Sequence, residues 1–140
     1  MSAKTKKMNE RTPPKNLKTL YYVLCDKSTG RPKVSVVVGC HDGQVCRGLS
    51  ICSDSEFREG FGFVERDGYK IAKRRMFRAF NRQENTGSII GDKAISVISK
   101  VAFPKDTSST VWLLFFSNKS QFNPELLAYE IKGLNNGRLA

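Results

Sequence analysis

Short runs of apolar and β-prone residues, separated by turn residues, fill the first third of the chain and indicate β-strands. Thr19–Cys25 is one such run, and turn residues follow it at 27–30. Lys33–Gly39 and Val45–Cys52 are two more, on either side of His41-Asp42-Gly43. An Asp-Gly pair between two β-prone runs predicts a hairpin. Three strands are therefore expected before residue 53.

The third of these runs has two sides of different character, because side chains alternate between the faces of a strand. One side carries Val45, Arg47, Leu49 and Ile51, and the other carries Gln44, Cys46, Gly48 and Ser50. The first side is expected to face a core and the second to be small and polar. Arg47 therefore occupies a position that the pattern reserves for an apolar residue.

A helix is predicted from Tyr69 to about Arg82, with Asp67 as its N-cap. Its apolar positions recur at three- and four-residue spacing, which marks one buried face. They are Tyr69, Ala72, Met76, Ala79 and Phe80. The remaining faces carry Lys70, Lys73, Arg74, Arg75, Arg78 and Arg82. The sequence thus predicts an amphipathic helix with a basic outer side.

Two further strands, Ala94–Phe103 and Thr110–Phe116, and a last helix complete the expected order β-β-β-α-β-β-α. Asn123-Pro124-Glu125 has the residues of a helix start, and this helix is expected to end near Lys132. The predicted fold class is α+β, an antiparallel sheet of about five strands with two helices packed on it. The expected organisation is a flexible basic arm over 1–17, one domain over 18–134 and a short tail over 135–140.

The chain is strongly basic, with 24 Lys and Arg against 13 Asp and Glu and a formal net charge of +11. The cations concentrate in two places: the first eighteen residues and the segment 58–82. Such a field attracts anions, and acidic proteins, membranes and nucleic acids all fit it by charge alone. For the first cluster, a solubilising tail is an alternative to a role in phosphate binding.

The start of the chain is polar and basic, and no apolar run reaches the roughly 18–20 residues of a membrane span. We therefore expect a cytoplasmic protein that is not in a membrane. Its four cysteines, Cys25, Cys40, Cys46 and Cys52, are then expected to be reduced thiols.

The most suggestive constellation is the end of the third strand together with the basic helix. Hydroxyl groups near a helix N-terminus and several arginines are what a phosphate group needs. The candidate phosphate ligands are Arg47, Ser50 and Ser53 from the strand end and Arg74, Arg75, Arg78 and Arg82 from the helix. The alternative is that the serines merely end a strand and the arginines are solvated.

Phe61 and Phe63 lie in a glycine-rich connection between that strand and the helix. Nucleobases stack on exposed aromatic rings, so both are candidate ligand contacts. They could equally cover the core beneath the loop.

Several other chemistries are disfavoured. Neither G-x-x-x-x-G-K-[ST] nor a strand-coupled G-x-G-x-x-G occurs. The spacing of Cys40, His41, Cys46 and Cys52 does not match a structural zinc site. No paired carboxylates at helical spacing offer general acid-base chemistry. We expect a protein that is not an enzyme, with no catalytic residues, metal or cofactor.

The stretch Arg47-Gly48-Leu49-Ser50-Ile51-Cys52-Ser53, followed by Phe57, Gly68, Ala72, Arg75 and Ala79, resembles the Thoeris anti-defence family of bacteriophage proteins, which sequester immune signals. The resemblance covers about a third of the chain. It implies an immune-evasion protein of the host cell cytoplasm that binds a cyclic ADP-ribose-type or cyclic oligonucleotide signal intact, as a homo-oligomer. By the same resemblance, Arg47, Ser50 and Ser53 would be strand-end contacts, and Arg75 and Arg78 would hold phosphate.

Two other functions fit the residues. The first is a small nucleic-acid-binding phage protein, in which the basic helix follows a phosphate backbone and the N-terminal arm adds contacts. The second is an inhibitor of an acidic protein or of a host complex that handles nucleic acids.

Overall fold

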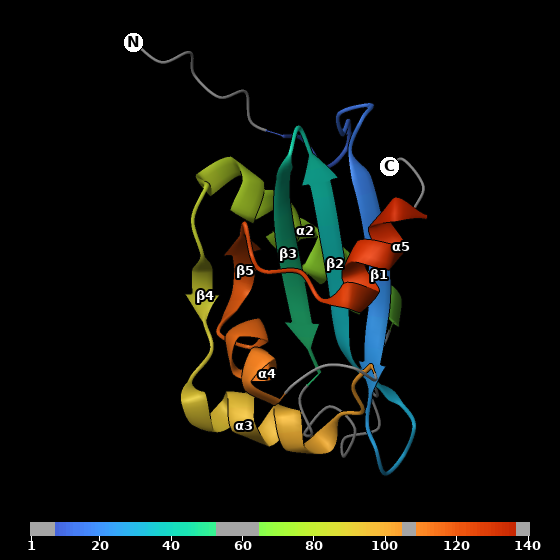
Figure 1. Cartoon of the computed structure of the whole chain (residues 1–140), viewed down its shortest axis with the longest axis vertical. Coiled ribbons are helices and arrows are strands. Elements are labelled where there is room, and N and C mark those ends of the chain that lie inside the picture. Colours follow the sequence, from blue (N-terminus) through green and yellow to red (C-terminus); the bar gives the residue numbers. More distant parts are fainter. Residues whose placement is uncertain (1–7, 53–64, 105–108, 137–140) are drawn as a thin grey trace.

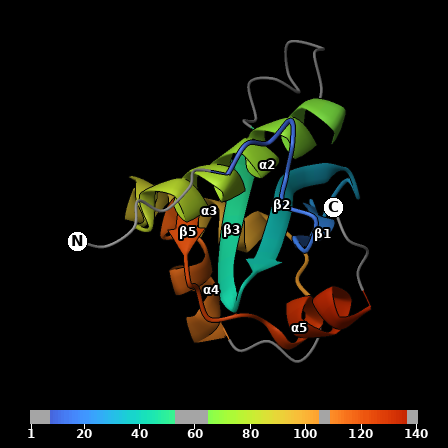
Figure 2. The ribbon, with the colours of Figure 1, turned by 90° about the horizontal axis from the view of Figure 1, so that it is seen from above.

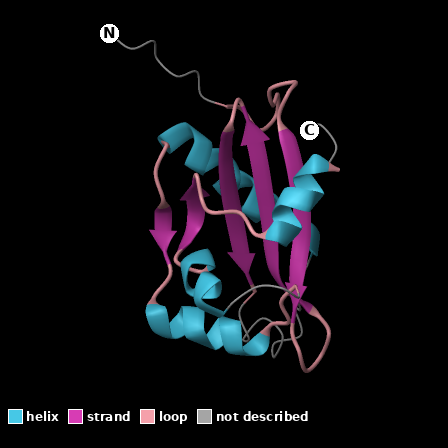
Figure 3. Ribbon diagram, viewed as in Figure 1, coloured by secondary structure: helices cyan, strands magenta, loops and turns pink. Residues whose placement is uncertain are grey.

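The structure, a computed structural model, describes residues 8–52, 65–104 and 109–136. It contains one antiparallel sheet with helices on both faces (Figures 1 and 3). The strands are β1 (Lys18–Cys25), β2 (Pro32–His41), β3 (Gln44–Ile51), β4 (Thr86–Ser88) and β5 (Asn118–Phe122). The helices are α2 (Glu65–Arg82), α3 (Gly91–Lys100), α4 (Ser109–Phe115) and α5 (Ala128–Asn135). The predicted class, α+β with a five-stranded antiparallel sheet, is confirmed.

The strands lie in the order β1-β2-β3-β5-β4. β1, β2 and β3 form a meander, and the predicted hairpin joins the last two through Asp42 and Gly43, with φ of 50° and 78°. Positive φ at both central residues is the requirement of a type I′ turn, which explains the Asp-Gly pair. β5 pairs with the other edge of β3 in the register Cys46↔Phe122 to Gly48↔Ser120.

Figure 2 shows the layers: α2 covers one face of the sheet, while α4 and α5 lie on the other. The α5 side holds the larger core cluster, to which Val34, Val36 and Val38 contribute from β2. Val37 points to the opposite face and packs with Ala72, Met76 and Phe80 of α2. β2 is thus buried on both faces, which explains its continuous apolar run.

The small side of β3 is the surface on which α2 lies. A Cβ atom at Gly48 would collide with the backbone carbonyl oxygen of Ala72, and one at Gly39 would collide with the sulfur of Met76. Glycine at these two positions therefore permits the close approach of helix and sheet. The predicted division of β3 into two sides is correct, and its small side is covered by α2.

Two predicted strands are helices. Ala94–Phe103 contains most of α3, whose buried residues Ala94 and Val97 are three positions apart, and Val101 follows four positions later. Thr110–Phe116 contains most of α4. β-branched composition favoured strands, but the helical spacing of the buried residues decides the structure, because only a helix brings those positions onto one face.

β4 and β5 were not predicted, because both are short and polar. The last helix begins at Ala128 and not after Asn123. Asn123 has φ of 49°, donates its backbone N–H to the carbonyl of Val45 and accepts the N–H of Val45 on its side chain. This asparagine therefore extends the β3–β5 contact by one residue and does not cap a helix.

Residues 8–17, assigned by the sequence to the flexible arm, contact the domain. Leu17 is fully buried in the core cluster beneath α2. The backbone of Met8 forms two hydrogen bonds with the side-chain amide of Asn81. The N–H of Met8 donates to Asn81 Oδ1 over 2.6 Å, and Asn81 Nδ2 donates to the carbonyl of Met8 over 3.1 Å. The chain before β1 thus runs along α2 (Figure 2). Within the described ranges, no helix has the length and apolarity needed to cross a membrane.

Candidate functional site

The outer side of α2 carries a row of cations at constant spacing. Lys70, Arg74, Arg78 and Arg82 are each four residues apart, and all four are exposed. At a rise of about 1.5 Å per residue, the row extends over about 18 Å. No acidic residue occurs between Gly68 and Arg82. We call these four residues the basic row.

Like charges four residues apart destabilise a helix, whereas alternating signs would stabilise it. A helix selected only for solubility would gain from acidic residues among its lysines and arginines. Among the residues that the structure describes, one ion pair reaches the row, and it comes from outside the helix: Glu10 lies 3.8 Å from Arg74, and both side chains are exposed. The row therefore presents positive charge at a cost to the helix, which suits a surface that binds an anion.

Arg75 lies on the same helix but is not part of the row. Its guanidinium donates a hydrogen bond of 2.6 Å to the backbone carbonyl of Leu49. The β3–β5 register ends at Gly48↔Ser120, so this carbonyl lies just beyond the last residue of β3 that pairs with β5. Burial, followed by the charges of Arg78 and Arg74, lowers the pKa of Arg75. Arg75 is therefore tied to the sheet edge by a structural bond.

Lys119 of β5 extends the positive surface beyond α2. Burial, followed by Arg75 and Lys93, lowers the pKa of its amino group. The repulsion shows that cations from α2, β5 and α3 lie within electrostatic reach of one another. Sequence reasoning missed Lys119 and Lys93, because nothing in the local pattern connects them to the helix.

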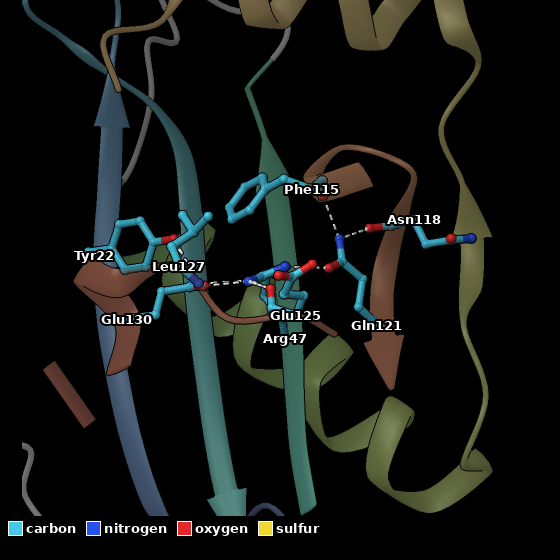
Figure 4. Close-up of polar contacts among 8 residues, drawn as sticks. All are labelled: Tyr22, Arg47, Phe115, Asn118, Gln121, Glu125, Leu127 and Glu130. Carbon is cyan, nitrogen blue, oxygen red and sulfur yellow. Dashed lines mark hydrogen bonds and ion pairs between the residues drawn. The ribbon is translucent and has the colours of Figure 1, made fainter. Parts of the chain in front are cut away.

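Arg47 is taken up by a buried polar network on the opposite face of the sheet (Figure 4). It is 2% exposed and forms an ion pair with the fully buried Glu130 of α5. Its Nε donates to Glu130 over 2.9 Å, and its terminal nitrogens donate to Gln121 and to the carbonyl of Glu125. The guanidinium also lies 4.4 Å from the ring centroid of Phe115. A phosphate contact by Arg47 would require this network to break.

The network continues to both sides of Glu130. The hydroxyl of Tyr22 donates to it over 2.9 Å, and the backbone N–H of Leu127 donates over 3.0 Å at the start of α5. Burial, followed by the charge of Glu130, raises the pKa of Tyr22 well above its usual range. Glu130 thus explains why an arginine occupies a position in β3 where the sequence pattern expects an apolar residue.

The other sequence-predicted contacts are scattered. Ser50 is buried opposite Ser35 on the face that α2 covers. Ser53, Phe61 and Phe63 lie outside the described residues. Of the candidate phosphate ligands, the structure brings together Arg74, Arg78 and Arg82 in the basic row, with Arg75 beside them.

A cavity of about 660 Å³ lies at the C-terminal end of α2. Three segments line it: the chain before β1, the β2–β3 turn and the end of the helix. The lining residues include Met8, Asn9, Thr12, Pro14, His41, Asp42, Gln44, Phe80, Asn81 and Gln83. His41 lies at the end of β2, next to the Asp42-Gly43 turn. Its ring is largely buried, and its Nδ1 has no hydrogen-bond partner among the described residues.

The four cysteines are free thiols, and Cys46 and Cys52 are buried. Burial raises the pKa of Cys46 to about 12, so its thiol is protonated at neutral pH. Within the described part of the chain, no three His, Cys, Asp or Glu side chains gather as a metal site would require.

Comparison with known proteins finds no family model, no curated protein and no solved structure that matches this chain.

Proposed function

We propose that this protein binds the phosphate backbone of a nucleic acid through the outer side of α2. The observation that carries the proposal is the basic row, four exposed cations in line on one helix with no acidic residue among them. A linear array of this length suits a chain of phosphates better than a single compact anion. Exposed Arg11 and Lys15, in the segment that runs along α2, add to the same field.

The position of Arg47 favours an extended binding surface over a compact phosphate site. The hypothesis of a compact phosphate site at the end of β3 needs the Arg47 guanidinium, which Glu130 and Gln121 hold on the other face of the sheet. Of the candidate phosphate ligands, Arg74, Arg78 and Arg82 are exposed, and they lie along α2. Binding without turnover, in the cytoplasm, is part of the proposal.

The test is the salt dependence of binding to labelled single and duplex strands, measured by fluorescence anisotropy between about 50 and 200 mM salt. In the row variant, Lys70, Arg78 and Arg82 are all changed to Gln. In the control variant, Lys27, Arg31 and Lys132 are all changed to Gln. These three residues are exposed in the β1–β2 turn and on α5. Both variants lose the same net charge, so they separate the row from the overall field.

We expect the row variant to lower the slope of log K against log salt by about 2 for a single strand, at about 0.7 per phosphate contact. The control variant should keep the slope and lose little affinity. Equal losses in the two variants would show that only net charge matters. If neither single nor duplex strands bind detectably at low salt, the proposal is rejected.

Sequestration of a cyclic nucleotide signal, as the resemblance implies, is the second candidate function. The observation that favours it is the 660 Å³ cavity next to the end of the basic row, because its volume falls within the range of small-molecule sites and the row could hold the phosphates. Native mass spectrometry with cyclic ADP-ribose-type and cyclic dinucleotide probes tests it. Intact retention in a defined homo-oligomer would support immune evasion by a sponge, and no retention of any probe would remove it.

A further inference from the structure

The cavity at the end of α2 differs chemically from the basic row beside it. None of its described lining residues is a lysine or arginine. The one carboxylate there, Asp42, lies 3.2 Å from His41 Nε2 and accepts a hydrogen bond from the amide of Asn16. A carboxylate without a lysine or arginine beside it makes a poor environment for a phosphate. The occupant that suits this cavity is uncharged.

The lining combines neutral hydrogen-bonding groups with an apolar wall. Amide and hydroxyl groups come from Asn9, Thr12, Gln44 and Gln83, and the apolar surface comes from Met8, Pro14 and Phe80. The amide of Asn81, also in the lining, bonds the backbone of Met8. A nucleobase is a flat ring with donors and acceptors on its edge, and amide side chains bind such edges in pairs of hydrogen bonds. His41 also belongs to the lining, and its buried Nδ1 has no partner in the described structure.

The cavity also lies where a base would follow a bound backbone. Arg82, the last cation of the row, directly precedes Gln83 of the lining, and Arg78 is two residues before Phe80. A backbone that follows α2 to its end therefore arrives next to the cavity. The segment 8–14 forms the other side and is held there by the two hydrogen bonds between Met8 and Asn81.

From the cavity and its position, we infer that it binds one unpaired nucleobase of the ligand whose phosphates lie on the basic row. This inference rests on the proposed function, because the row supplies the phosphate contacts. The base has two possible sources, a single strand and a free nucleotide, and both present the same chemistry. A duplex keeps its bases stacked and paired, so single strands are the preferred nucleic acid.

The experiment compares a short oligoadenylate with a strand of the same length and charge in which every base is absent. We expect the wild-type protein to bind the base-bearing strand about tenfold or more tightly, the usual worth of one well-held base. Thr12→Trp, which fills the mouth, and Gln44→Ala, which removes an amide, should reduce that ratio toward one. The row variant should weaken both strands alike and keep the ratio.

The single histidine of the chain gives a second, site-specific readout. The NMR signals of the His41 ring should shift on addition of oligoadenylate and not of the abasic strand. Adenosine monophosphate alone is the probe for the second source. A shift of the same signals that is lost in Thr12→Trp would assign the cavity to the base of a free nucleotide.

Equal affinity of the wild type for the two strands, with unmoved His41 signals for all probes, would overturn the inference and leave the basic row intact. Failure of the proposed function gives a different result, because neither strand would then bind at low salt. A duplex bound more tightly than the single strand would also contradict a site for an unpaired base.

Discussion

Arg47 of β3 and Glu130 of α5, 83 positions apart in the chain, form a buried ion pair in which neither side chain reaches solvent. Each charge compensates the other, because an unpaired charge in a protein interior lowers the stability of the fold by several kcal/mol. Gln121, Tyr22 and the start of α5 complete the hydrogen bonding. The pair thus fixes the position of α5 on the sheet.

Arg47→Met is expected to destabilise the protein by about 3–5 kcal/mol, because Glu130 would remain buried and unpaired. Adding Glu130→Gln removes that charge but keeps an acceptor for Tyr22 and Leu127, so the double variant should recover about 2 kcal/mol or more. Urea unfolding midpoints measure both. Glu125→Gln, at an exposed position nearby, is the control and should stay within about 0.5 kcal/mol of the wild type. A double variant as unstable as the single one would contradict the role of the pair.

Gly48→Ala is expected to lower the free energy of unfolding by about 1–3 kcal/mol, because its new methyl group meets the backbone of α2 at Ala72 and that backbone must move. Gly91→Ala is the matched control. Nothing lies near a Cβ atom at Gly91, and alanine favours the first turn of α3. Thermal unfolding should separate the two variants, and a harmless Gly48→Ala would show that α2 does not lie this close to β3.

The two neighbouring arginines Arg75 and Arg78 should have different effects. Arg75→Ala removes the donor to the Leu49 carbonyl and should lower the free energy of unfolding by about 1–2 kcal/mol. Arg78→Ala, at an exposed position, should leave stability within about 0.5 kcal/mol and weaken nucleic-acid binding instead. Urea titrations and salt-dependent anisotropy on both variants test this. Equal stability of the two would make the Arg75 bond unimportant.

Stability should decline at alkaline pH, in part through Cys46. Burial raises the pKa of its thiol from 9.0 to about 12, so between these values the unfolded chain loses a proton that the folded protein keeps. Stabilisation by the protonated thiol is complete below pH 9 and falls as pH rises toward 12, by at most about 1.4 kcal/mol per pH unit. Urea unfolding at a series of pH values measures the slope.

Cys46→Ala should flatten that slope, whatever it does to the overall stability. Val37→Ala, in the same core cluster, also removes volume but no titrating group, so it should keep the wild-type slope. If Cys46→Ala and the wild type had parallel pH profiles, the raised pKa of Cys46 would be wrong.

The first half of the fold was readable from the sequence, because its signals are local. The Asp42-Gly43 turn and the apolar face of α2 depend on residues a few positions apart. α3 was misread because Val97, Ile98 and Val101 favour strands by type but lie at helical spacing. β5, with sequence NKSQF, has no strand signal of its own, and it is a strand because the edge of β3 is available to it.

The candidate site divides in the same way. The cations of α2 were predicted from helical periodicity, and the structure aligns three of the predicted arginines with Lys70. Arg47 was recognised as a misplaced charge, but its partner Glu130 lies too far along the chain for any local pattern to reveal. The cavity was missed because it is made by three separate segments, one of them assigned to a flexible arm.

The distance between Arg47 and Glu130 also matters while the chain is being made. At about 5–20 residues per second, the ribosome needs about 4–17 s to add the 83 residues that separate them. β1 and β2 precede Arg47 in the chain, and the end of β3 and all of α2 follow early in that interval, yet the guanidinium of Arg47 has no Glu130 carboxylate to meet until the interval ends. The face of the sheet that carries it must therefore stay open to water until the last helix emerges, so the α2 side of the sheet is free to assemble first and α5 closes the opposite side at the end.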